Sequence, residues 1–130
     1  PPPPEPVDAP PIPFAERMPV FGNECFDLED AERKMCSDRA LLSFVQSRAH
    51  YPALARENGV QGMVVIAFTV EKDGSVTDIE AVREVPAGCT ESALKAVRAI
   101  QTEGKKFLPG RQGGLPVRVR FNLPVKFSLE

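Results

Sequence analysis

The sequence predicts an α+β fold in which two or more helices pack on a three-stranded antiparallel sheet. Three observations support this prediction. Apolar residues recur at helical spacing within residues 38–49 and again within residues 90–103. An Asp-Gly turn at residues 73–74 separates two strand-like runs, which is a strong short-range signal for a hairpin. Residues 115–129 then alternate apolar and polar side chains, the pattern of a half-buried strand.

The N-terminal region is unusually rich in proline. Eight of the 14 prolines fall within the first 13 residues. Proline fixes φ and lacks an N–H donor, so this stretch suits an extended polyproline II conformation rather than a helix or the interior of a sheet. A spacer or a disordered tail is favoured over a ligand for an aromatic groove. We therefore expect a linker over residues 1–22 and a folded domain over residues 23–130.

Two helices are expected early in the domain. Asp27 is placed to cap a short helix over residues 28–35. Ser37 or Asp38 is placed to start a second helix, which buries one apolar face and ends near residue 49.

A third, short helix is expected at residues 53–58. Tyr51-Pro52 ends the preceding helix because the residue before proline avoids the helical region. Proline also suits the start of the next helix, and Gly59 is a natural left-handed stop after it.

The hairpin strands and the last helix follow. Residues 63–70 are apolar on both faces, which predicts a central strand covered by helices. Residues 76–85 form the returning strand and are more polar, so we expect them to be more exposed. Thr90 is placed to cap the helix over residues 90–103.

The closing run, residues 115–129, is predicted to be one long edge strand. Every odd position is apolar, while Arg118, Arg120 and Lys126 occupy even positions on the opposite, wet face. Pro116 and Pro124 interrupt the run, and each leaves the ladder of hydrogen bonds one donor short. Prolines within a strand are tolerated at a sheet edge or a bulge, so this strand is the expected edge.

Charge is unevenly distributed, although the net charge is only −2. Residues 1–94 hold 8 basic and 16 acidic side chains, a net −8, and residues 95–130 hold 8 basic and 2 acidic, a net +6. We expect folding to mix the two regions into a near-neutral surface. The overall balance argues against a dedicated nucleic-acid binder, which is usually basic as a whole domain.

Several motifs resemble the C-terminal domain of TonB proteins. They are Tyr51-Pro52, the run over residues 55–62, the Asp-Gly hairpin, residues 107–110 and the closing residues 123–127. The resemblance spans roughly residues 37–129. The three-cysteine layout and residues 111–117 look most like the Bacteroidetes branch of the family. Phe107 stands where the family commonly has Trp, and we expect it to fill the same core position.

The resemblance implies a mechanical rather than a catalytic function. TonB-like domains bind the TonB box of outer-membrane TonB-dependent transporters and relay energy from an inner-membrane motor of the ExbB/ExbD type. It also implies a periplasmic domain, joined by its proline-rich linker to an inner-membrane helix that is absent from this chain. An exposed sheet edge carries unpaired N–H and C=O groups, so an extended peptide can add to it as a strand.

The resemblance and the edge prediction together indicate a partner-binding site beside residues 117–127. Its expected residues are Val117, Arg118, Val119, Arg120, Phe121, Asn122, Leu123 and Lys126, with Tyr51 as a side-chain contact near the strand. The three cations are expected to attract acidic residues flanking the peptide, each exposed pair contributing at most about 1 kcal/mol. Parallel and antiparallel docking both fit this pattern.

A disulfide is expected because the resemblance implies the periplasm, where disulfides persist. We hypothesise that Cys25 pairs with Cys36 and that Cys89 stays free at the start of the last helix. Three reduced thiols, or a pair that includes Cys89, are the alternatives.

The residues predict no enzyme, no metal site and no cofactor. His50 is the only histidine, and the cysteines lack the CxxC spacing of zinc or redox sites. The glycines at 110, 113 and 114 lack the Lys-Ser/Thr of a phosphate loop. Acidic side chains flank the hairpin turn in an arrangement that fits turn chemistry better than calcium binding: Glu71, Asp73 and Asp78.

Two other functions compete with the energy transducer. The first is a TonB-like sensory domain of a membrane-anchored metallopeptidase signal transducer. The second is an inhibitor-like or adhesion domain that shares only a helix-on-sheet fold. The sequence upstream of this chain would distinguish the transducer from the sensory domain. One transmembrane helix favours the transducer, and several with an HExxH motif favour the sensor.

Overall fold

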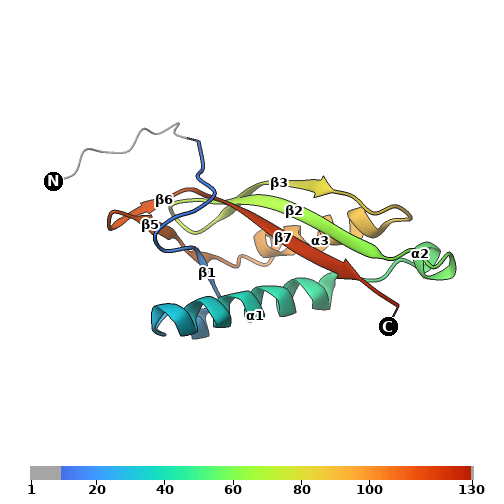
Figure 1. Ribbon diagram of the computed structural model, residues 1–130, viewed down its shortest axis with the longest axis horizontal. Coiled ribbons are helices and arrows are strands. Elements are labelled where there is room, and N and C mark those ends of the chain that lie inside the picture. Colours follow the sequence, from blue (N-terminus) through green and yellow to red (C-terminus); the bar gives the residue numbers. More distant parts are fainter. Residues whose placement is uncertain (1–9, 130) are drawn as a thin grey trace.

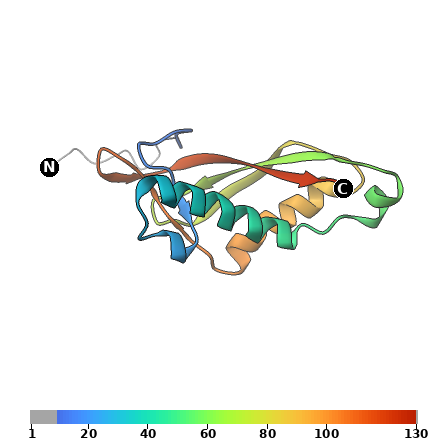
Figure 2. The same ribbon diagram turned by 60° about the horizontal axis from the view of Figure 1, so that its bottom comes forward.

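The computed structural model describes residues 10–129, and its centre is a three-stranded antiparallel sheet with the order β3-β2-β7 (Figure 1). The strands are β2 (Gly62–Val70), β3 (Val76–Arg83) and β7 (Val119–Phe127). Helices α1 (Asp30–Arg48) and α3 (Cys89–Thr102) cover one face of this sheet (Figure 2). The α+β prediction and the central position of the first hairpin strand are confirmed.

Shorter elements complete the chain. They are β1 (Val20–Phe21), the 3-10 helix η1 (Asn23–Cys25), α2 (Ala53–Glu57), β4 (Phe107–Leu108), β5 (Gly110–Gln112) and β6 (Leu115–Val117). Strand β1 pairs with β4, and β5 pairs with β6, both antiparallel. Among residues 10–129, no helix has the length and apolar character needed to cross a bilayer.

The core lies between the sheet and the two long helices. Phe68 of β2 is fully buried, and its ring centroid lies 5.4 Å from that of Phe121 and 6.0 Å from that of Phe107. Phe107 is only 3% exposed and also contacts Phe21, which lies 5.1 Å away. Phe107 therefore fills a core position, as expected for the residue that stands at the family's Trp.

Helix α1 is continuous, so the predicted break at Ser37 is wrong. Ser37 is buried within the helix, and its hydroxyl accepts a hydrogen bond of 2.7 Å from the backbone N–H of Phe21. A serine hydroxyl favours a helix start when it bonds to nearby backbone groups, and here a partner outside the helix replaces them. Asp27 does not cap the helix, which begins at Asp30 after Glu29.

Helix α3 begins one residue earlier than predicted and is not capped by Thr90. Gly88 precedes it with a left-handed φ of 89°. The Thr90 hydroxyl instead accepts from the N–H of Val85 at 2.9 Å and donates to its C=O at 3.0 Å. Thr90 therefore fixes the connection between β3 and α3 rather than the end of the helix.

The single closing strand predicted for residues 115–129 is divided in two. Strand β6 turns back on β5 through Gly113 and Gly114, both with positive φ. Arg118 then separates β6 from β7, which pairs with β2 instead. The alternation of side chains continues across this point, so the pattern alone does not reveal that the strand changes partner.

The folded unit begins before residue 23. Val20 and Phe21 are buried, and the backbone of Arg17 exchanges two hydrogen bonds with that of Arg111, at 2.8 and 3.1 Å. The linker boundary expected at residue 22 thus leaves part of the folded domain in the linker. Most of the polyproline stretch expected at the N-terminus falls on residues 1–9, which lie outside the described residues.

Cys25 of η1 and Cys36 of α1 form a disulfide, with their Cα atoms 5.6 Å apart. The link ties the loop after β1 to the second turn of α1. Cys89 is a buried free thiol, and burial raises its pKa above the ordinary value. A raised pKa keeps the thiol protonated, so Cys89 is a packing residue rather than a nucleophile.

Candidate peptide-binding edge

Strand β7 is one border of the sheet. It pairs on its inner side with β2, in a continuous register from Val70 opposite Val119 to Gly62 opposite Phe127. Figure 1 shows β7 in red along the border of the sheet, with α1 beneath it. The edge position predicted from the internal prolines matches this topology.

Hydrogen bonds to Ile12 show which backbone groups of β7 face outward. The C=O of Arg118 accepts from the N–H of Ile12 at 3.1 Å, and the N–H of Arg120 donates to the C=O of Ile12 at 2.8 Å. Successive strand residues direct their N–H and C=O groups to opposite sides. Even-numbered residues therefore face outward, and we call the outward backbone of residues 118–126 the β7 edge.

The part of the β7 edge beyond Ile12, residues 122–126, offers backbone N–H donors at Asn122 and Lys126. Both residues continue the even-numbered series and, within the described chain, have no backbone partner on that side. Pro124 lies between them and contributes a C=O but no N–H. Because its missing donor points away from β2, Pro124 costs the β2–β7 ladder nothing.

The odd-numbered residues of β7 hold the strand on the core. Val119 and Leu123 are buried, and Phe121 is half-buried against Phe68. Val117 does not belong to this strand, because it lies in β6 opposite Gly110. The edge is therefore shorter than the range of residues 117–127 expected from the sequence.

The Arg118 side chain is engaged by a carboxylate of the same domain and does not extend freely into solvent. Its guanidinium donates to both carboxylate oxygens of Glu71, at 2.7 and 3.2 Å, and the two side chains are each 23% exposed. The Thr77 hydroxyl donates to the same carboxylate. The Arg118 hydrogen bond, followed by that of Thr77, holds the pKa of Glu71 below its ordinary value.

Arg120 is bound in the same way. It donates to the Thr69 hydroxyl at 3.1 Å and to the C=O of Asp78 at 2.7 Å, and it forms an ion pair with Glu80. These pairs join the basic end of the chain to the acidic remainder, which is the mixing of charge expected from the sequence. Lys126 on the same face is exposed, and no carboxylate of residues 10–129 pairs with it.

Tyr51 lies at the far end of β7. Its ring packs edge-on against Phe127, with centroids 5.7 Å apart, and its hydroxyl donates to the C=O of Val60. The guanidinium of Arg56 lies 5.4 Å from the ring centre. The side chain thus braces the end of the strand against the loop before β2.

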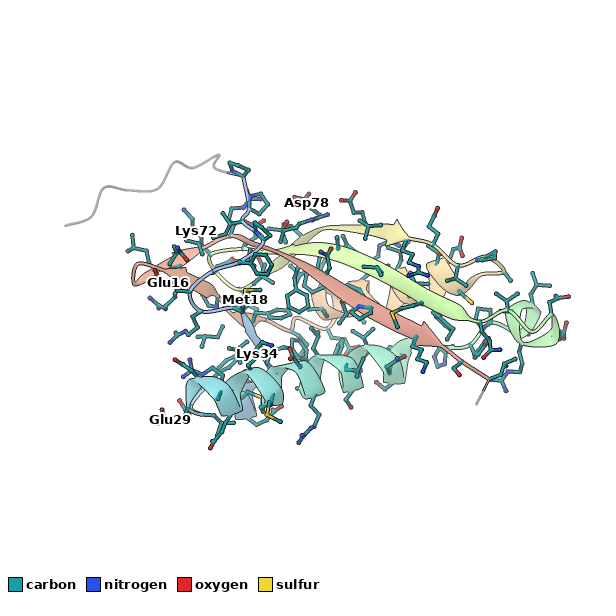
Figure 3. All side chains as sticks on the ribbon, in the orientation of Figure 1. Glu16, Met18, Glu29, Lys34, Lys72 and Asp78 are labelled. Carbon is teal, nitrogen blue, oxygen red and sulfur yellow. A yellow bond between two sulfur atoms is a disulfide. The ribbon has the colours of Figure 1, made fainter. Side chains whose placement is uncertain are left out.

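A groove of about 630 Å³ lies between the N-terminal segment (residues 10–19), α1 and β7. Figure 3 labels Met18 of the segment and Lys34 of α1 in this region. Phe121 of β7 and Phe14, which is 80% exposed, also line it. The groove places apolar surface beside the β7 edge.

The Glu71–Arg118 pair predicts a stability change at acid pH. A glutamate with a folded pKa below 4.5 stabilises the fold above that pH, and the contribution is lost as the pH falls through the folded pKa. Urea unfolding of the wild type and of Glu71→Gln should therefore differ by about 1 kcal/mol at pH 7, and the difference should be smaller at pH 3. In an Arg118→Gln background the difference at pH 7 should shrink markedly. An equal difference at both pH values would contradict the prediction.

Sequence reasoning did not find Glu71 and Glu80 as partners of the two arginines, and it did not find Ile12 at the edge. The place of Glu71 beside the Asp-Gly turn indicates turn chemistry and gives no sign of its ion pair. The signal for both glutamates lies in the register, because β3, β2 and β7 are neighbours and place them beside the arginines. Among residues 10–129, Glu24, Cys25 and Cys36 are the one group of potential metal ligands that lie close together, and the two sulfurs are already joined in the disulfide.

Several known proteins are similar to this chain in sequence, and solved structures are similar to it in fold. The family model for the C-terminal region of Gram-negative bacterial TonB proteins matches residues 47–129. Protein TonB of Helicobacter pylori is 30% identical over 86 residues, which cover 66% of this chain and 28% of that protein. Protein TonB of Vibrio cholerae is 28% identical over 94 residues, or 72% of this chain and 36% of that protein. The chain thus spans about a third of the length of these relatives.

Solved structures agree with this assignment. An NMR structure of the C-terminal domain of Helicobacter pylori TonB matches with a TM-score of 0.52 and 27% identity, covering 69% of this chain and 90% of that one. A second NMR structure of a longer fragment has a TM-score of 0.53 and 24% identity, covering 81% and 87%, and supports the fold alone. With a family match over more than half of its length, the chain belongs to the family of Gram-negative bacterial TonB C-terminal domains.

Proposed function

We propose that this domain binds the TonB box of outer-membrane TonB-dependent transporters by β-strand addition along the β7 edge. The protein that contains it then relays proton-motive-force energy from an inner-membrane motor of the ExbB/ExbD type to the transporter, for nutrient uptake. The observation that carries the proposal is the outward backbone of Asn122, Pro124 and Lys126 in a family member.

Backbone pairing suits a domain that serves several transporters. Residues 122–126 of the edge offer two N–H donors, at Asn122 and Lys126, and three C=O acceptors, which include that of Pro124. A peptide that pairs with these groups gains affinity with few demands on its sequence. The peptide position opposite Pro124 loses one bond, so the ladder is interrupted but not ended.

Side chains of the peptide then supply selectivity. The groove beside Phe121 and Met18 accepts an apolar side chain, and Lys34 stands at its α1 side. Lys126 is an exposed cation on the open face with no carboxylate partner among residues 10–129, whereas Arg118 and Arg120 are engaged by Glu71 and Glu80. Acidic residues flanking the peptide therefore gain less from the arginines than the sequence suggested.

The setting of this function is the periplasm. We place the domain there, joined through the proline-rich N-terminal region to an inner-membrane anchor and to the motor outside this chain. The free energy reaches the transporter as a pull on the added strand, so the domain needs no chemistry of its own. We propose no nucleic acid, small-molecule substrate, cofactor or enzymatic activity for this domain.

Alternate N-methylation of the peptide tests the mechanism. Two synthetic peptides from the TonB-box region of a transporter of the same bacterium carry equal numbers of N-methyl groups, placed on either of the two alternating sets of residues. In one of them the methyl groups block the amides that face β7, and its affinity by calorimetry should fall at least tenfold, or about 1.4 kcal/mol. The other should bind almost as well as the unmodified peptide. Equal binding by all three would exclude strand addition.

A further inference from the structure

We propose that Pro11-Ile12-Pro13 is an intramolecular plug on the β7 edge, which a partner peptide displaces in order to pair with Arg118 and Arg120. The inference rests on the proposed function and adds a regulatory feature to the same site. In Figure 1 the blue N-terminal segment crosses the start of β7 before it descends to β1.

Ile12 already occupies the first outward positions of the edge. It pairs with β7 in parallel, opposite Val119, and its two hydrogen bonds use the C=O of Arg118 and the N–H of Arg120. A peptide that extends along the whole edge needs the same two groups. The chain's own segment and a partner peptide therefore exclude each other at this end of β7.

The prolines on either side of Ile12 give the segment the character of a plug. Because Ile12 directs its N–H and C=O toward β7, the backbone groups of Pro11 and Pro13 face away from the sheet. A proline there presents no N–H donor, so no further strand can pair fully with the new border. The Pro-Ile-Pro pattern thus covers one rung of the edge without extending the sheet.

The plug is held less firmly than the chain that follows it. Pro13 and Phe14 are exposed, and Phe14 is 80% exposed. From Arg17 onward the chain is anchored by the paired backbone of Arg111 and then by buried β1. Glu16 is also held, because its N–H donates to the side-chain oxygen of Gln112 at 2.8 Å. Residues 10–13 can consequently leave β7 by rotation about residues 14 and 15, while β1 stays in the core.

Detachment also uncovers the open face of the sheet. Pro11 lines a hollow with Thr69, Asp78 and Arg120, and Thr69 is fully buried although it lies on the face opposite the helices. Loss of the plug therefore removes apolar cover from the Arg120 cluster as well as freeing its backbone N–H. A partner peptide in the same place covers the Arg120 cluster again and accepts a hydrogen bond from the Arg120 N–H.

Amide exchange in the full 130-residue chain tests the docking without any partner. Ile12→Pro removes the hydrogen bond from the Ile12 N–H to the C=O of Arg118, which weakens docking of the segment. Exchange of the Arg120 amide, which donates to the C=O of Ile12, is expected to become about tenfold faster or more. The Phe121 amide points to β2 and should be unchanged. Leu42→Ala, at an exposed position of α1 outside the groove, is the control and should leave both amides as in the wild type. Equal Arg120 exchange in all three proteins would overturn the plug.

Peptide affinity tests the competition. The apparent affinity of a site is its intrinsic affinity multiplied by the fraction of molecules in which the site is unoccupied. A site that its own segment covers most of the time therefore binds a peptide more weakly. Ile12→Pro should therefore bind a fluorescent TonB-box peptide about three- to tenfold more tightly than the wild type, and Leu42→Ala should bind it as the wild type does. Faster Arg120 exchange with unchanged or weaker peptide affinity would overturn the competition alone. No peptide binding by any variant would overturn the proposed function and, with it, the competition, while the exchange result would still decide the docking.

Discussion

Replacing Asn122 with proline should weaken peptide binding more than tenfold and leave the domain folded. The N–H of Asn122 points outward and has no backbone partner among the described residues, so the fold loses no hydrogen bond. Pro124 already occupies the equivalent position two residues later. We expect a stability change of about 1 kcal/mol or less, because proline is tolerated at such edge positions. Binding of the peptide should weaken more than tenfold, measured by calorimetry on the folded variant.

Proline at the adjacent Phe121 provides the opposite result. Its N–H points to β2, opposite Phe68, so the substitution removes a bond from the centre of the sheet. The cost should be about 3 kcal/mol or more beyond that of Phe121→Ala, which accounts for the lost ring. Urea unfolding of the three variants measures this difference. Similar destabilisation by proline at 121 and 122 would show that the outward assignment of even-numbered residues is wrong.

Gly74→Ala should be the most damaging small substitution in the hairpin. Gly74 has a φ of 86°, and a Cβ there would lie 2.0 Å from the C=O oxygen of Phe107. Its own C=O accepts a hydrogen bond of 2.9 Å from the N–H of Phe107, so the two backbones cannot separate without losing that bond. We expect destabilisation of at least about 3 kcal/mol, which combines left-handed strain with the steric clash.

Gly104→Ala is the matched control for that prediction. Gly104 also has a positive φ, of 67°, but nothing lies within 4 Å of its added Cβ. It should therefore show only the conformational cost of about 1 kcal/mol. Urea unfolding of the two variants separates strain from contact. Equal losses would mean that the hairpin moves away from β4 at little cost.

Local signals were sufficient to predict the hairpin, α2 and most of α3, because each is specified by neighbouring residues: the Asp-Gly turn, Pro52 with Gly59, and the helical spacing of residues 90–103. The division between β6 and β7 was not predictable in this way. Side chains alternate without interruption through Arg118, and only the change of partner from β5 to β2 separates the strands. The false break at Ser37 has a similar origin, since its partner is the distant Phe21.

The candidate edge was predictable because proline reports directly on hydrogen bonding, and Pro124 marks an outward N–H position. The charges on that strand were not. The carboxylates that engage Arg118 and Arg120 lie 47 and 40 residues earlier, and only the strand register brings them together. The single rung made by Ile12 has no periodic signal at all, because one residue between prolines carries no repeating pattern.

The order of strands also has a consequence for how the chain folds. Strand β3 reaches the central strand β2 through a short hairpin turn. The other neighbour of β2, β7, lies much later in the sequence, after α3 and the β5–β6 hairpin. Such non-local pairing is slow, because a long loop must close before the contacts reward it. During that delay β2, apolar on both faces, has one bare border that other chains can join. Correct assembly of the sheet therefore depends on how quickly β7 reaches β2.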